Sequence, residues 1–195
     1  MKKDIILAGV GGQGILSIAA TIGMAAINMG LHLKQAEVHG MSQRGGDVQS
    51  NLRISDKEIA SDLIPKGKAD MIIAVEPMES LRYLPMLSPI GWVITNTTPF
   101  INIRNYPPVE KILEEVSKLP RHIALDADAI AKELGSTRSA NMVILGAASP
   151  YLDIPIEKIE EAIYKIFSRK GEEVAEINIQ CFKAGRAFGE QYIKH

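Results

Sequence analysis

The chain has 195 residues, of which 46% are hydrophobic and 23% are charged, so we expect one ordered domain over 1–195 and not a disordered or fibrous protein. Lys and Arg total 22 against 23 Asp and Glu, and the formal net charge of −1 disfavours nucleic acid as a partner. The single cysteine, Cys181, excludes an intrachain disulfide and any iron–sulfur cluster held by four thiolates of this chain.

No part of the sequence is typical of a secretion signal or a membrane span. The first apolar run is short and leads directly into glycines, which is unlike a signal peptide. Gly, Pro or charged residues interrupt every apolar stretch before it reaches about 18 residues, the length that a membrane span needs. We therefore expect a cytoplasmic protein with no membrane partner.

A strand, a glycine turn and a helix open the chain. Residues 5–8 form a short apolar run, which is typical of a strand buried on both faces of a parallel sheet. Apolar residues then recur every three or four positions over 14–29, which predicts a helix that Gly30 ends. The same patterns predict strands at 31–38, 48–54, 71–75, 92–95 and 123–125, and helices at 78–84, 109–119 and 127–134.

The C-terminal third is predicted to be helical. Helical periodicity covers 141–148 and 156–167. A last helix is expected at 174–188 if close packing needs Gly185 and Gly189, because each costs about 1 kcal/mol relative to alanine inside a helix. The alternation of strands and helices predicts an α/β fold, with a mostly parallel, Rossmann-like sheet, helices on both faces and a helical C-terminal segment.

Gly9, Gly11 and Gly14 form the pattern GxGxxG between the first strand and the first helix. Backbone N–H groups and a helix N-terminus can bind a phosphate in such a turn. Glu37 follows at about the place where a dinucleotide fold has the carboxylate that binds ribose. The same glycines also suit a tight turn without a ligand. A free-standing NAD(P)-dependent oxidoreductase and a structural turn therefore both stay open.

A second unusual segment is AEVHGMSQRGG at 36–46, whose glycines and polar side chains are not typical of a core. Arg44 offers a planar cation to a phosphate or a carboxylate, and His39, Ser42 and Gln43 add hydrogen-bonding groups. The alternative is a solvated loop in which the arginine pairs with a nearby carboxylate. Both glycine segments follow strands, so we expect them to open at the same edge of the sheet.

Isolated polar residues after other strands give weaker predictions. Glu76 and Asp126 each follow a predicted strand, where a carboxylate either projects at the edge of the sheet or begins the next helix. Cys181 lies in a predicted helix with no histidine near it in the sequence, which favours a small buried hydrophobic residue over a nucleophile.

Several segments together resemble one known family: GVGGQG at 9–14, AEVHGMSQRGG at 36–46, the region of Arg53, and NMVILGA at 141–147. They resemble the gamma-type subunit of 2-oxoacid (pyruvate):ferredoxin oxidoreductases, and the resemblance covers nearly the whole chain. Within that family, HGMSQRGG is most similar to the beta subunit of indolepyruvate ferredoxin oxidoreductase. The resemblance implies a complex that oxidatively decarboxylates an arylpyruvate with coenzyme A to an acyl-CoA, CO2 and reduced ferredoxin.

The resemblance also implies a division of labour. A large partner subunit would carry thiamine diphosphate and the iron–sulfur clusters, ferredoxin would accept the electrons, and this chain alone would be inactive, with no catalytic or metal-binding residue. Its two motifs would face the partner's active site and contact coenzyme A or only dock the partner; a non-catalytic assembly module stays the further alternative. The residues carried over are Gly11, Gly12, Gln13, Gly14, Glu37, His39, Ser42, Gln43, Arg44, Gly45 and Gly46.

Overall fold

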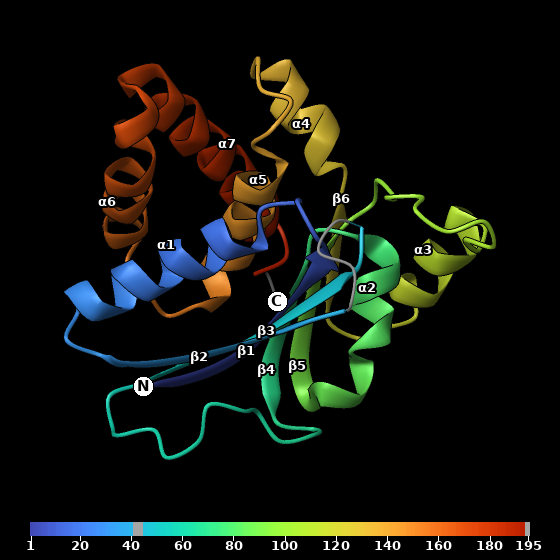
Figure 1. Cartoon of the computed structure of the whole chain (residues 1–195), viewed down its shortest axis with the longest axis horizontal. Coiled ribbons are helices and arrows are strands. Elements are labelled where there is room, and N and C mark those ends of the chain that lie inside the picture. Colours follow the sequence, from blue (N-terminus) through green and yellow to red (C-terminus); the bar gives the residue numbers. More distant parts are fainter. Residues whose placement is uncertain (41–44, 194–195) are drawn as a thin grey trace.

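The computed structural model describes residues 1–40 and 45–193. Its centre is a six-stranded sheet of order β2-β3-β1-β4-β5-β6, with helices on both faces (Figure 1). This confirms the predicted α/β class and the mostly parallel sheet. The strands are β1 (Lys2–Val10), β2 (His32–His39), β3 (Asp47–Ser55), β4 (Ala69–Ala74), β5 (Leu87–Asn96) and β6 (His122–Leu125).

β1 joins two differently built halves of the sheet. It pairs in parallel with β4, and β4, β5 and β6 continue the parallel half. On its other side β1 pairs antiparallel with β3, which pairs antiparallel with β2. β2 therefore runs in the direction of β1, and the carboxyl ends of β1, β2, β4, β5 and β6 all reach the same edge.

The helices divide between the two faces. In Figure 1, α1, α5, α6 and α7 lie on one face of the sheet, and α2 and α3 lie on the other. Every predicted helix is present within a few residues of its expected bounds. The helices are α1 (Ile15–Asn28), α2 (Pro77–Arg82), α3 (Val109–Ser117), α4 (Ala127–Glu133), α5 (Ala140–Ala148), α6 (Ile156–Phe167) and α7 (Glu172–Glu190), with short 3-10 turns η1 (Leu84–Met86), η2 (Ser149–Tyr151) and η3 (Ser168–Lys170).

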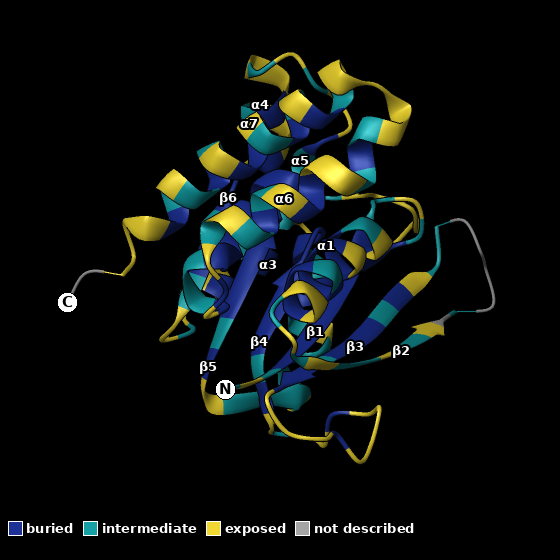
Figure 2. Cartoon of the chain, turned by 90° about the vertical axis from the view of Figure 1, so that its left-hand side faces the viewer, coloured by how far each residue is buried: buried dark blue, intermediate teal, exposed yellow. Residues whose placement is uncertain are grey.

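β1 is buried on both faces, as its apolar run predicts. Ile5 and Leu7 belong to the large core beneath α1, α5, α6 and α7, whereas Ile6 and Ala8 belong to a smaller core on the opposite face. This alternation follows from the two-residue period of a strand. Figure 2 shows the consequence, with buried strands in the middle and exposed residues on the outer faces of the helices.

α5 and α7 pack backbone against backbone, which explains the glycines in the last helix. A Cβ on Gly185 would lie 1.9 Å from the Val143 carbonyl oxygen, and one on Gly189 would lie 2.3 Å from that of Ala147. Only glycine permits such an approach. The close packing that was required for a helix containing Gly185 and Gly189 is therefore present. None of the described helices is long and apolar enough to cross a bilayer.

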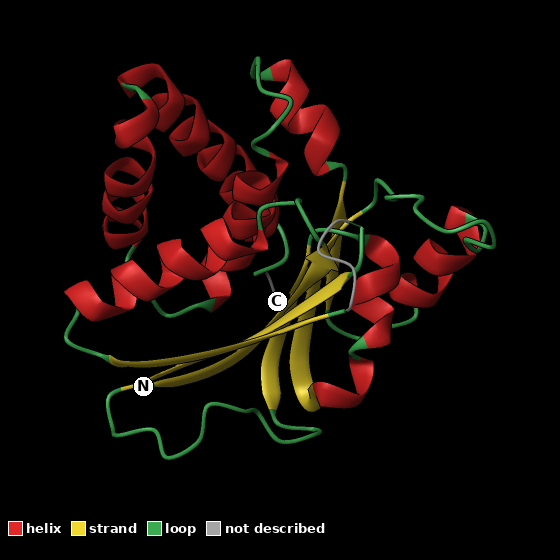
Figure 3. Cartoon of the chain, viewed as in Figure 1, coloured by secondary structure: helices red, strands yellow, loops and turns green. Residues whose placement is uncertain are grey.

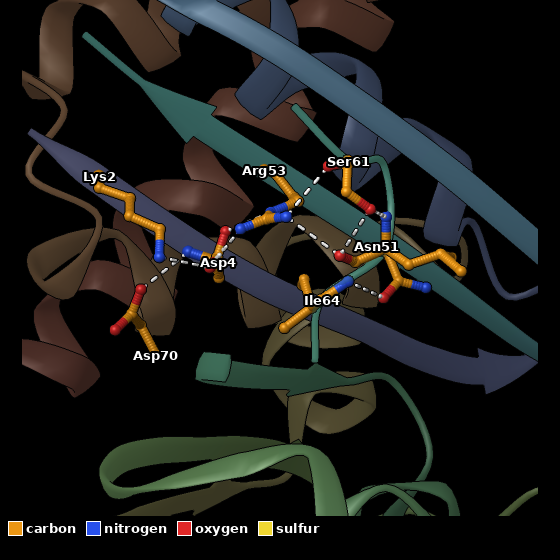
Figure 4. A network of polar contacts seen from close by, with 8 residues as sticks. Lys2, Asp4, Asn51, Arg53, Ser61, Ile64 and Asp70 are labelled. Atoms are coloured by element: carbon orange, nitrogen blue, oxygen red, sulfur yellow. Dashed lines mark hydrogen bonds and ion pairs between the residues drawn. The ribbon is translucent and has the colours of Figure 1, made fainter. Parts of the chain in front are cut away.

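The segment between β3 and β4 crosses the end of the sheet opposite the carboxyl edge as an irregular loop (Figure 3). Arg53 holds it in place. Its guanidinium donates to both carboxylate oxygens of the buried Asp4, at 2.8 and 3.0 Å, and to the carbonyls of Ser61 and Leu63 at 3.0 Å each. Figure 4 shows how these groups converge between β1 and β3. Arg53 therefore has a structural role, remote from the glycine segments.

Candidate functional site

The first glycine turn connects β1 to α1 at the carboxyl edge. Gly12 and Gly14 have φ angles of 102° and 83°, in the left-handed region that favours glycine. Within the turn, Val10 N–H donates to the side-chain oxygen of Gln13 at 2.8 Å. The backbone conformation thus accounts for two of the glycines, and the Gln13 side chain stabilises the turn from within.

The two glycine segments meet at this edge. The backbone N–H of Gly11 donates to the carbonyl of Gly46 at 2.9 Å, which confirms the expectation that both segments open on the same side of the sheet. Gly40 N–H donates to the Asp47 carbonyl at 3.0 Å, where β2 and β3 converge. Of the predicted residues, Ser42, Gln43 and Arg44 lie outside the described part of the chain, as does the side chain of His39.

Glu37 lies on β2, opposite Ser50 of β3. Because β3 separates β2 from β1, Glu37 is not on the strand next to the glycine turn. A dinucleotide-binding fold has the ribose-binding carboxylate on that neighbouring strand. The topology therefore removes the main support for NAD(P) binding, which came from the spacing of Glu37.

Beside the glycine turn lies a pocket of about 790 Å³. Gly12, Gln13 and Gly14 line one part of it, and residues 135–141 and α7 line another. The side-chain amide of Asn141 donates to the Gly14 carbonyl at 3.1 Å and so joins the start of α5 to the start of α1. The pocket brings together segments that are more than a hundred residues apart in the sequence.

The pocket combines features that attract anions with an apolar wall. The N-termini of α1 and α5 both line it. Gly14, the N-cap of α1, has no side chain, and Ser139, the N-cap of α5, makes no side-chain hydrogen bond to its own helix. Helix N-termini present backbone N–H groups and a partial positive charge. Two cationic side chains, Arg138 and Lys170, also line the pocket. The apolar part of the wall is formed by Val75, Phe100, Ile144, Phe167, Val174 and Ile177.

One carboxylate, Asp128, lines the same pocket. It accepts a hydrogen bond from the Asn96 side-chain amide at 2.7 Å, and Asn96 Oδ1 in turn accepts from Ala127 N–H at 3.1 Å. These hydrogen bonds hold the Asp128 carboxylate at the carboxyl ends of β5 and β6. The arrangement suits an amphipathic ligand with anionic groups at the helix N-termini and cations.

Residues 136–141 line the pocket, although none of them was among the site residues predicted from the sequence. The run Ser136-Thr137-Arg138-Ser139 contains three hydroxyls and a cation directly before a predicted helix. That composition is typical of a helix N-terminus that can meet an anion, so a local signal was present. Its proximity to the first glycine turn depends on tertiary folding and has no local signature.

Glu76 and Asp126 both begin helices, as one of their two interpretations predicts. The Glu76 carboxylate accepts from Glu79 N–H at the start of α2, and the Asp126 carboxylate accepts from Ala129 N–H at the start of α4, each at 2.9 Å. Cys181 is buried in α7, and burial raises the pKa of its thiol. The structure thus confirms Cys181 as a buried hydrophobic residue.

Comparisons with known proteins agree with this architecture. The family model for pyruvate ferredoxin/flavodoxin oxidoreductase matches residues 4–188. The indolepyruvate oxidoreductase subunit IorB of Archaeoglobus fulgidus is 39% identical over 194 residues, which cover 95% of this chain and 94% of that subunit. This chain therefore resembles that subunit both in sequence and in length.

Two solved structures share the fold. A 2-oxoglutarate:ferredoxin oxidoreductase from Magnetococcus marinus, with 2-oxoglutarate, coenzyme A and succinyl-CoA bound, superposes with a TM-score of 0.77 at 25% identity, over 97% of this chain and 31% of that chain. Pyruvate oxidoreductase subunit PORC from Thermotoga maritima gives a TM-score of 0.74 at 22% identity, over 95% and 96%. The first spans three times the length of this chain, whereas the second is a separate subunit of similar size.

Proposed function

Because the chain belongs to the pyruvate ferredoxin/flavodoxin oxidoreductase family, we propose that it is the smaller subunit of an indolepyruvate (arylpyruvate):ferredoxin oxidoreductase. The complex oxidatively decarboxylates the 2-oxoacid with coenzyme A and gives an acyl-CoA, CO2 and reduced ferredoxin. The 39% identity to an indolepyruvate oxidoreductase subunit supports this substrate class.

The contribution of this chain is to bind coenzyme A, and the pocket at the start of α1 and α5 carries this proposal. Coenzyme A has several phosphate charges and a long, partly apolar body. Its phosphates suit the two helix N-termini and the cations Arg138 and Lys170. Phe100 and Phe167 supply apolar surface for the uncharged part. Coenzyme A in the Magnetococcus marinus enzyme, whose fold this chain shares, adds support.

The redox cofactors belong to the partner in this proposal. The residues of this chain do not fit an iron–sulfur cluster, since its one cysteine is buried in α7. A large partner subunit carries the clusters and thiamine diphosphate, and ferredoxin takes the electrons. The carboxyl edge, where Gly11–Gly14 meet Gly45 and Gly46, faces the partner's active site, and this chain holds the coenzyme A phosphates without supplying a catalytic group.

The decisive experiment replaces one cation of the pocket in the reconstituted complex. Arg138→Ala should raise the KM for coenzyme A about tenfold or more with little change in kcat, because a charge-assisted hydrogen bond is worth about 1.5–3 kcal/mol. Arg169→Ala is the matched control. It removes an exposed arginine next to Lys170 that does not line the pocket, and it should leave the KM unchanged.

Equal kinetics for Arg138→Ala, Arg169→Ala and the unmodified complex would contradict coenzyme A binding in this pocket. Arg44→Ala separates the two roles proposed for the second glycine segment, since a raised KM for coenzyme A indicates contact and unchanged kinetics indicate docking only. Oxidation of an arylpyruvate by the chain without its partner, or micromolar binding of NADH in calorimetry, would overturn the division of labour.

A further inference from the structure

The carboxyl edge contains a second arrangement, centred on Glu76. This side chain is fully buried, with 0% of its surface exposed. One carboxylate oxygen, Oε2, accepts from Glu79 N–H within α2. The other, Oε1, accepts from the backbone N–H of Phe100 at 3.2 Å and from the hydroxyl of Tyr106 at 2.5 Å. Two residues of the loop after β5 therefore converge on a single oxygen atom.

These two contacts anchor residues 98–106, which we call the strap. Outside them the strap is largely exposed. Burial, and then the hydrogen bond to Glu76, raise the pKa of Tyr106, so its hydroxyl stays protonated and remains a donor at neutral pH. A buried carboxylate is costly unless donors satisfy it. Glu76 Oε1 has its two described donors only when the strap is in this position, which makes the contact specific.

The strap touches both parts of the candidate site. Phe100 lines the pocket, and the Asn102 side-chain amide donates to the carbonyl of Gly45. The next residue, Gly46, accepts from Gly11 in the first glycine turn. A continuous series of contacts thus runs from Glu76 through the strap to Gly45 and Gly46, and on to the turn that forms the other side of the pocket.

We propose that Glu76 is a positioning residue that, through the strap, sets Phe100 in the pocket wall and Gly45 beside the first glycine turn at the same time. Glu76 itself does not line the pocket, and it acts through Phe100 and Asn102. A movement of Phe100 is transmitted to Asn102, and the reverse, because both residues belong to one short segment that is held at Oε1 of Glu76. The effect on coenzyme A rests on the proposed function, whereas the positioning does not.

The test is amide hydrogen exchange of the full chain without ligand, in three variants. Tyr106→Phe removes only the hydroxyl and should speed exchange about tenfold in peptides covering 98–106, and also at Gly11, whose N–H donates to the Gly46 carbonyl. Asn102→Ala breaks the later link, to the Gly45 carbonyl, and should speed exchange at Gly11 but not in 98–106. Tyr164→Phe is the matched control, because it removes a tyrosine-to-glutamate hydrogen bond, to Glu172, on the exposed surface of α6. It should change neither region.

Tyr106→Phe should affect both regions and Asn102→Ala only the glycine segments. A merely structural role of Glu76 would not produce this order. If Tyr106→Phe loosens the strap but leaves exchange at Gly11 unchanged, or if Asn102→Ala speeds exchange in 98–106 as much as at Gly11, the proposal is overturned. In the reconstituted complex, Tyr106→Phe should raise the KM for coenzyme A more than kcat falls. Should neither Tyr106→Phe nor Arg138→Ala alter that KM while the exchange order holds, the proposed function fails and the positioning role is supported.

Discussion

Asp4 and Arg53 form an ion pair with little contact with solvent, their side chains being 1% and 13% exposed. Asp4→Asn removes the charge that compensates the guanidinium and should lower the free energy of unfolding by about 3 kcal/mol. Urea unfolding followed by circular dichroism measures this. Lys2→Ala breaks the other ion pair of Asp4, whose lysine is 59% exposed, and should cost about 1 kcal/mol or less. Equal losses in the two variants would contradict the role of burial.

At the same scale, residue type and position in the chain predicted some roles well. A carboxylate directly after a strand is a common helix start, and Glu76 and Asp126 are both of this kind. The additional bonds of Glu76 to Phe100 and Tyr106 had no signal in the sequence, because they join the start of α2 to residues of an irregular loop 24 and 30 positions later. Local pattern reports what a residue does for its own helix and not what else it holds.

Among the elements, the contact between α5 and α7 is the most sensitive to side-chain size. Gly185→Ala should lower the free energy of unfolding by about 3 kcal/mol, although alanine is favoured by about 1 kcal/mol in an isolated helix, because its Cβ overlaps the Val143 carbonyl. Gly30→Ala is the control, with no atom within 4 Å of the added Cβ and a positive φ of 73°. It should cost about 1–2 kcal/mol from backbone strain alone. Thermal or urea unfolding compares them, and a stabilised Gly185→Ala variant would refute this close packing.

Apolar runs and helical periodicity predicted the strands and helices because each depends on neighbouring residues. Strand pairing depends on distant ones, and the antiparallel insertion of β3 between β1 and β2 was not predicted from 48–54. The candidate site likewise has one part that depends on neighbouring residues and one part that depends on distant residues. Gly12 and Gly14 follow from a local turn motif, whereas residues 136–141 join them only through the packing of α5 against α1, where Asn141 meets Gly14.

For the whole molecule, the large core argues that 1–195 unfolds as one unit. This core includes residues of five strands together with α1, α5, α6 and α7, so no part of that layer keeps its apolar contacts without the rest. Differential scanning calorimetry should give one transition whose calorimetric and van't Hoff enthalpies agree, at about 135 kcal/mol from an average of about 0.7 kcal/mol per residue. Two resolved transitions would instead indicate two domains.

The hydrogen bond between Asn141 and Gly14, which spans 127 positions, also bears on how the protein is made. A ribosome adds about 5–20 residues per second, so roughly 6–25 s separate the synthesis of Gly14 from that of Asn141, and the α7 part of the pocket lining follows later. A nascent chain that already contains the strand, turn and first helix therefore has only part of the lining. Binding of the proposed ligand, coenzyme A, would be delayed until late in translation, and it could not guide the folding of the N-terminal half.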